Sequence, residues 1–73
     1  MFRYQAVEMY CYKDGYTTYG ILADKLEGND WKPVAFVADV TCNKEFAIEL
    51  SNKCTAGQLD PIHIYDVVTD FIS

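Results

Sequence analysis

The sequence predicts an α+β fold in which a three-stranded antiparallel β-meander is followed by two helices packed on one face of the sheet, in the order β-β-β-α-α. Two observations support this prediction. Residues 2–40 alternate apolar, β-forming stretches with polar turn clusters, which is typical of short strands. Residues 43–73 instead carry apolar side chains at helical spacing. A chain of this length is expected to be a single domain, residues 1–73.

Residues 2–12 form the first predicted strand, because Tyr, Val and Met dominate and no Gly or Pro interrupts them. We expect its odd positions, Val7, Met9 and Cys11, to face the core, since Glu8 lies on the even face. The opposite face then carries three tyrosines, Tyr4, Tyr10 and Tyr12, whose spacing allows an aromatic ladder.

A turn signal at residues 13–15 separates the first strand from a second one at residues 16–23. A three-residue loop pairs Val7 with Ile21 and collects the apolar sets of both strands on one face. A two-residue loop would place Ile21 on the face of Glu8. Because a one-residue slip inverts every side chain, we favour the three-residue loop.

Residues 24–33 are mostly polar and contain a Gly-Asn-Asp cluster, which predicts a loop. Trp31 is unusual in such a segment; it either covers the edge of the core or belongs to an interface. Residues 34–40 form the third predicted strand, whose nearly continuous apolar character favours a central position. Its expected inward residues are Val34, Phe36 and Ala38.

The first predicted helix covers residues 43–55. Thr41 or Asn43 can cap its start, and Gly57 is the expected stop. Four apolar residues fall on one stripe of this helix: Phe46, Ala47, Leu50 and Cys54.

The last helix has an explicit start signal. Asp60 can cap it, Pro61 suits its first position, and Leu59 can pack against Ile64 as a hydrophobic staple. One apolar stripe is expected at Ile62, Tyr65, Val68 and Ile72, widened by Ile64, Val67 and Phe71.

Charge and composition exclude several function classes. The net charge is −5, and the six basic residues are scattered, which argues against nucleic acid and anionic membrane surfaces as partners. No apolar run has the length of a membrane span, and the first residues do not resemble a signal peptide. We therefore expect a cytoplasmic protein. The three cysteines show no close pairing and are expected to be reduced thiols.

Residues with catalytic or ligand chemistry are few. Cys54, His63 and Asp66 supply the residue types of a nucleophilic triple, but three such residues occur together by chance. Cys42 could join Cys54 and His63 as metal ligands, although the close spacings of structural zinc sites are missing. We expect no enzyme and no cofactor. If function involves the last helix, the candidate polar residues are His63, Asp66 and Asp70.

Apolar residues make up 51% of the chain and aromatic residues 15%, which is much for so small a core. This excess predicts a non-enzymatic protein-interaction module, either a homodimer or the small subunit of a larger partner. The alternative is a small-molecule or metal-binding domain that uses His63 with Cys54 or Cys42. Gly20 indicates either a bulge or a ring lying across the sheet, or else the close approach of a ligand. The candidate interface residues are Tyr4, Tyr10, Tyr12 and Trp31.

Three segments between residues 17 and 71 resemble a family of short uncharacterised bacterial proteins, mostly from anaerobic Gram-positive organisms. They are Tyr19-Gly20-Ile21, which Thr17-Thr18 precede, then Asp39-Val40-Thr41, and the closing stretch Gln58-Leu59-Asp60-Pro61-Ile62-His63-Ile64-Tyr65-Asp66-Val67-Val68-Thr69-Asp70-Phe71. The chain has Asp60, Thr55 and Thr69 where the family often has Ser, Asn and Glu. The resemblance implies no activity. It supports the same fold in a bacterial cytoplasm.

Overall fold

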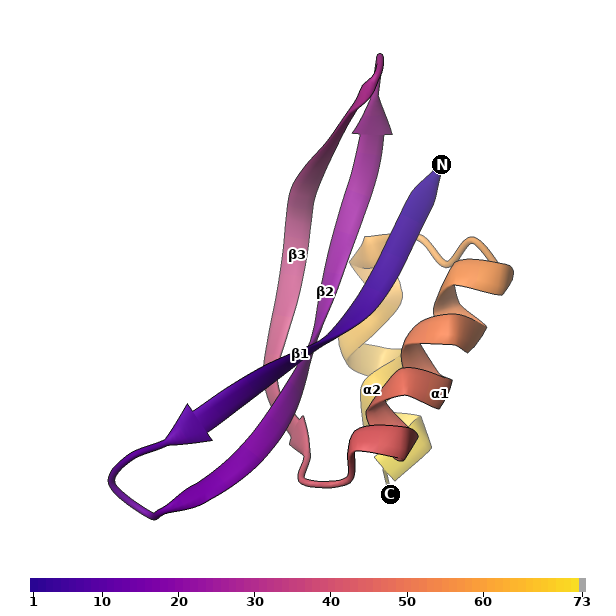
Figure 1. The fold of residues 1–73 in the computed structure, drawn as a ribbon. Coiled ribbons are helices and arrows are strands. Elements are labelled where there is room, and N and C mark those ends of the chain that lie inside the picture. Colours follow the sequence, from indigo (N-terminus) through magenta and orange to yellow (C-terminus); the bar gives the residue numbers. More distant parts are fainter. Residues whose placement is uncertain (73) are drawn as a thin grey trace.

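The computed structural model describes residues 1–72, and the side chains of residues 1–71. Three antiparallel strands form one sheet in the order β1-β2-β3, and both helices lie on the same face of it (Figure 1). The predicted α+β fold with β-β-β-α-α order is therefore confirmed. The elements are β1 (Phe2–Cys11), β2 (Tyr16–Glu27), β3 (Asp30–Thr41), α1 (Lys44–Ala56), the short 3₁₀ turn η1 (Pro61–His63) and α2 (Ile64–Ile72).

The register of the first hairpin differs from the prediction. Cys11 pairs with Tyr16, which leaves residues 12–15 as a four-residue loop, so the expected three-residue loop is wrong. Tyr4 consequently pairs with Ala23 on the face that the helices cover, and only 4% of its surface is exposed. Its hydroxyl donates a hydrogen bond to the carbonyl of Leu59, so the buried polar atom is satisfied.

The odd residues of β1 therefore face away from the helices. Val7, Met9 and Cys11 are half-buried, and the expectation that they line the core is wrong. Glu8 does not keep its face of β1 out of the core. Its own side chain is exposed, and its carboxylate accepts a hydrogen bond from the hydroxyl of Tyr19 at 3.4 Å.

β3 is an edge strand, and β2 is the central one. Val37 and Val40 are buried, whereas Val34 and Phe36 are 47% and 41% exposed, so the predicted inward set of Val34, Phe36 and Ala38 is wrong. Val37 pairs with Ile21 and Ala35 pairs with Ala23, so both face the helices, and their neighbours Val34 and Phe36 point away. Further along β3, Asp39 has a φ of 54° and the pairing shifts. The shift lets two residues three apart both point inward.

Gly20 faces this irregularity. A Cβ atom at Gly20 would lie 2.8 Å from the ring of Phe36 and 2.7 Å from the carbonyl oxygen of Val37. Of the alternatives that the sequence left open for Gly20, both structural ones apply, since the pairing is irregular here and the ring of Phe36 lies against the glycine.

The polar segment 24–33 is not a loop. β2 and β3 continue through it as a hairpin and turn at Gly28-Asn29, where Gly28 has a φ of 63°. Asp24 is buried and Trp31 pairs with Leu26 across the strands. Contacts with β1, distant in sequence, stabilise these polar residues within the sheet.

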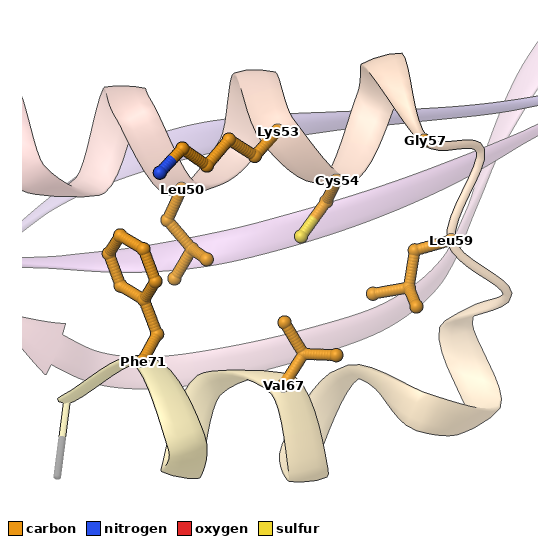
Figure 2. A pocket seen from close by; sticks show the side chains of 7 residues that line it. All are labelled: Leu50, Lys53, Cys54, Gly57, Leu59, Val67 and Phe71. Carbon is orange, nitrogen blue, oxygen red and sulfur yellow. The ribbon is translucent and has the colours of Figure 1, made fainter.

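α1 begins and ends as predicted. The side chain of Asn43 accepts a hydrogen bond from the backbone of Phe46 at 3.1 Å, and the N–H of Gly57 closes the helix on the carbonyl of Lys53. Its buried stripe contains Ala47, Leu50 and Cys54. α1 and α2 run antiparallel and face each other across a narrow space (Figure 2).

α2 buries part of the predicted apolar stripe. Asp60 caps the segment as expected, with its carboxylate accepting from the N–H of Ile62 at 3.1 Å. The first turn is a 3₁₀ turn, which has three residues per turn, and the regular α-helix begins at Ile64. Ile62 and Tyr65 are 78% and 65% exposed, so the prediction is wrong for these two residues. Val68 and Ile64 are buried as predicted, and Val67 and Phe71 pack against the core beside them. The side chain of Ile72 lies outside the described residues.

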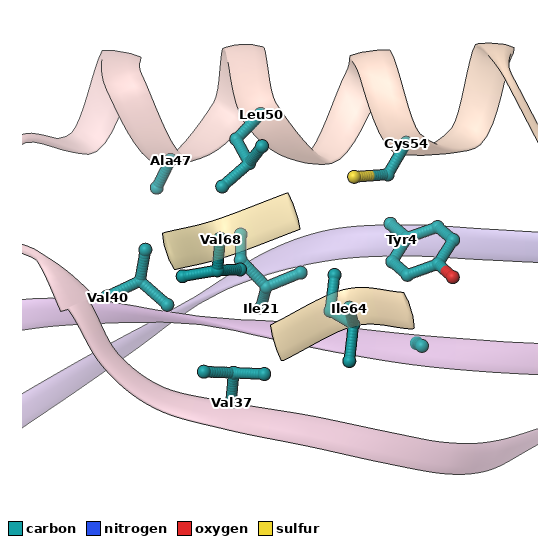
Figure 3. Close-up of a cluster of buried hydrophobic side chains, with 10 residues drawn as sticks. Tyr4, Ile21, Val37, Val40, Ala47, Leu50, Cys54, Ile64 and Val68 are labelled. Atoms are coloured by element: carbon teal, nitrogen blue, oxygen red, sulfur yellow. The ribbon is translucent and has the colours of Figure 1, made fainter. Parts of the chain in front are cut away.

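The core joins both helices to the sheet (Figure 3). Side-chain hydrogen bonds from the end of α1 also hold the outer edge of β1. The hydroxyl of Thr55 accepts from the N–H of Tyr4 at 2.9 Å, and the amide of Gln58 bonds both backbone groups of Phe2. The buried apolar residues are Tyr4, Ile21, Ala23, Val37, Val40, Ala47, Leu50, Cys54, Ile64 and Val68.

Candidate functional site

The sheet face that points away from the helices carries many apolar side chains. Side chains alternate along a strand, so residues next to the buried Tyr4, Ile21 and Ala23 point to this other side. We call this surface the open face. It contains Arg3, Gln5, Val7, Met9 and Cys11 of β1, Tyr16, Thr18, Leu22, Asp24 and Leu26 of β2, and Trp31, Pro33 and Phe36 of β3. Val34 lies at a shift in the pairing, next to the inward Ala35, and we count it with this face because side chains alternate along the strand.

An ion pair lies at one end of the open face. The guanidinium of Arg3 lies 2.9 Å from the carboxylate of Asp24, and Gln5 donates to the same oxygen at 3.2 Å. The guanidinium also stacks 4.5 Å from the centre of the Trp31 ring. Sequence reasoning missed this group, because Asp24 and Trp31 were assigned to a loop and nothing in their spacing indicates Arg3.

A shallow pocket of about 280 Å³ lies near the other end of the open face. The hydroxyl of Thr18 donates to the carboxylate of Asp39 at 2.6 Å. This carboxylate, and to a smaller extent Cys11, raises the pKa of Tyr16. The lining residues are Met9, Tyr10, Cys11, Tyr16, Thr18 and Asp39.

The predicted interface residues do not form one surface. Tyr4 belongs to the core, where burial, and to a smaller extent the charges of Cys54 and Asp60, raises its pKa to about 12. Tyr10 and Tyr12 are exposed near the tip of the β1–β2 hairpin, with their ring centres 4.8 Å apart in an edge-to-face arrangement. Trp31 alone of the four lies on the open face.

The polar residues of the last helix are exposed. His63 ends the 3₁₀ turn, and its backbone N–H donates to the carbonyl of Asp60 at 2.9 Å. Asp66 and Asp70 are exposed on α2.

The predicted ligands do not converge. Cys42 is exposed before the start of α1, and Cys54 is buried near its end. The ten helical steps from Lys44 to Cys54, with a rise of about 1.5 Å each, separate the two regions by about 15 Å. Within residues 1–71, no group of three or more His, Cys, Asp or Glu side chains could hold a metal ion.

A groove of about 240 Å³ opens between α1 and α2 (Figure 2). Cys54 points into it, and burial raises the pKa of its thiol, which makes it a poor nucleophile at neutral pH. Sequence reasoning treated Cys54 as a small core residue and did not detect the groove. The lining residues are Leu50, Lys53, Cys54, Gly57, Leu59, Val67 and Phe71.

Comparison with known proteins identifies a family without an assigned activity. Within residues 1–72, no helix is both long and apolar enough to cross a membrane. No curated protein and no solved structure gives a significant match. The model of DUF6514, a family of unknown function, matches residues 1–73. The expectation of an uncharacterised family is thereby confirmed, and the chain belongs to the DUF6514 family.

Proposed function

We propose that this chain is a non-enzymatic protein-interaction module that forms a homodimer through the open face of its sheet, in the cytoplasm of a bacterium. The main support for this proposal is that only one face of the sheet is covered by helices. Both helices pack on one face, and the other retains exposed apolar side chains, Val34 and Phe36 among them. Exposed apolar side chains gathered on one uncovered face are typical of a contact site.

The edges of the sheet are less suited to contact than its open face. Gln58 and Thr55 already bond the outer edge of β1. The outer strand β3 carries Lys32 and Pro33, and such residues hinder the addition of a further strand. A partner is therefore expected to pack on the face instead of extending the ladder.

A second copy of the chain suits this face. Two sheets that pack face to face lie about 10 Å apart and interdigitate their apolar side chains. In an isologous contact, the open face of one copy packs against the open face of the other, so both apolar surfaces are buried at once. A domain of this size has a marginal core, so the added burial also stabilises the fold.

Sedimentation equilibrium tests this proposal with two matched variants. Val34→Lys places a charge on the open face, and Ile62→Lys places one on an exposed apolar residue of the helical side. We expect the unmodified chain and Ile62→Lys to be dimers and Val34→Lys to be a monomer. A monomeric unmodified chain, or loss of the dimer in Ile62→Lys alone, would overturn the proposal.

A further inference from the structure

The groove between α1 and α2 has the size of a small-ligand site. An apolar cavity of about 150 Å³ holds one benzene ring, and pockets for drug-sized molecules begin at about 300 Å³. At about 240 Å³ the groove accommodates one ring with a short substituent. The groove is open because the side chains of Cys54 and Val67 are short; larger side chains at either position would fill it.

The groove carries one charge. Lys53 is the only charged residue among those that line it, and its amino group lies 5.2 Å from the centre of the Phe71 ring. The same amino group pairs with Glu49 at 3.2 Å, and both side chains are largely exposed. Exposed pairs of this kind contribute little free energy, so Lys53 can exchange Glu49 for an anion at small cost.

Carbonyl groups at the C-terminal end of α1, which would repel an anion, accept hydrogen bonds. The N–H of Gly57 donates to the carbonyl of Lys53, and the N–H of Leu59 donates to that of Cys54. The side chain of Gln58 donates to the carbonyl of Thr55. These bonds offset part of the negative potential at the helix C-terminus.

We propose that this groove binds a small monocarboxylic acid, whose apolar body lies between the helices and whose carboxylate pairs with Lys53. The apolar lining supplies the attraction for the body of the ligand, and Lys53 selects an anion over a neutral or cationic analogue. The site is separate from the open face and does not depend on the proposed dimer.

Three probes of the same shape and different charge test the site: 3-phenylpropionate, 3-phenylpropanamide and 3-phenylpropylamine. Each is titrated into the ¹⁵N-labelled chain while amide chemical shifts are followed. We expect saturable shifts at Lys53, Gly57, Val67 and Phe71, with dissociation constants in the millimolar range for ligands of this size. The carboxylate should bind about two- to fivefold more tightly than the amide, and the amine more weakly than both.

Substitutions distinguish the contribution of the Lys53 charge from that of the apolar groove. Lys53→Gln should abolish the preference for the carboxylate, and Lys53→Arg should retain it. Lys44→Gln, at the opposite end of α1, makes the same change in net charge and should leave the preference intact. Cys54→Met fills the groove and should weaken all three probes while the amide spectrum stays that of the folded chain.

Three results would overturn the proposal. They are equal affinity for the three probes, shifts that map to the open face instead of the groove, and a preference for the carboxylate that survives in Lys53→Gln. Since none of these results depends on oligomeric state, failure here is distinguishable from failure of the dimer.

Discussion

The side chain of Gln58 bonds the backbone of Phe2 as a neighbouring strand would. Its carbonyl oxygen accepts from the N–H of Phe2 at 2.8 Å, and its amide nitrogen donates to the carbonyl of Phe2 at 2.9 Å. The two residues are 56 positions apart in the sequence. Gln58 is held in a left-handed conformation, with a φ of 48°. This contact ties the connection between the helices to the edge of β1.

Gln58→Ala is expected to lower the free energy of unfolding by about 1–2 kcal/mol, because both hydrogen bonds to Phe2 are lost at a site that water can reach. Urea denaturation followed by circular dichroism measures the change. Asn52→Ala, which removes an exposed amide side chain from α1, serves as a comparison and should cost less. A midpoint for Gln58→Ala equal to that of the unmodified chain would show that the contact does not stabilise the fold.

The Arg3–Asp24 pair is expected to couple energetically. The Asp24 side chain is almost completely buried, whereas the Arg3 side chain is partly exposed. We therefore expect a coupling energy of about 1–2 kcal/mol between them. A double-mutant cycle with Arg3→Met and Asp24→Asn measures it. Additive effects of the two substitutions would mean that the pair contributes nothing beyond its separate contacts.

Alkaline pH is expected to destabilise the fold through Tyr4. Burial raises its pKa to about 12 from the ordinary value of 10.0, so the folded state retains the phenol proton where the unfolded state has lost it. The stabilisation is complete below pH 10 and is lost as the pH rises towards 12. Urea titrations between these pH values should show a shallower loss of stability in Tyr4→Phe than in the unmodified chain. The exposed Tyr12→Phe should retain the full slope, and an unchanged slope in Tyr4→Phe would contradict the assignment.

Gly20→Ala is expected to destabilise the chain by about 1–3 kcal/mol, because the new Cβ atom meets the Phe36 ring and the Val37 carbonyl at under 3 Å. Gly57→Ala is the control, since its nearest contact would be an ordinary 3.4 Å. Thermal unfolding of both variants measures the difference. Equal melting temperatures would show that the Phe36 ring moves away without cost.

The features that the sequence predicted correctly are those set by short stretches of chain. The cap at Asn43, the stop at Gly57 and the cap at Asp60 each depend on neighbours within a few residues. Gly20 was also interpretable, because a glycine within a strand has few structural explanations. These local signals determined the order of the elements.

The features that the sequence did not predict depend on distant contacts. Both faces of β1 are apolar, so the choice between Tyr4 and Val7 as core residues was decided by α1, which covers one face and not the other. The pairing of β3 with β2 determined which residues of β3 point inward, and packing in the core determined the buried face of α2. The group of Arg3, Asp24 and Trp31 was missed for the same reason. Its members are far apart in the sequence, and Trp31 meets Arg3 only in the folded sheet.

The homodimer through the open face is tested most directly by nuclear Overhauser effects between two differently labelled copies of the chain. Mixed samples of ¹³C-labelled and unlabelled protein reveal contacts that cross the interface and exclude those within one copy. A dimer through the open face should give such contacts at Val34, Phe36 and Met9 and none at Ile62 or Tyr12. Contacts confined to Ile62 or Tyr12, or no intermolecular contact at all, would contradict it.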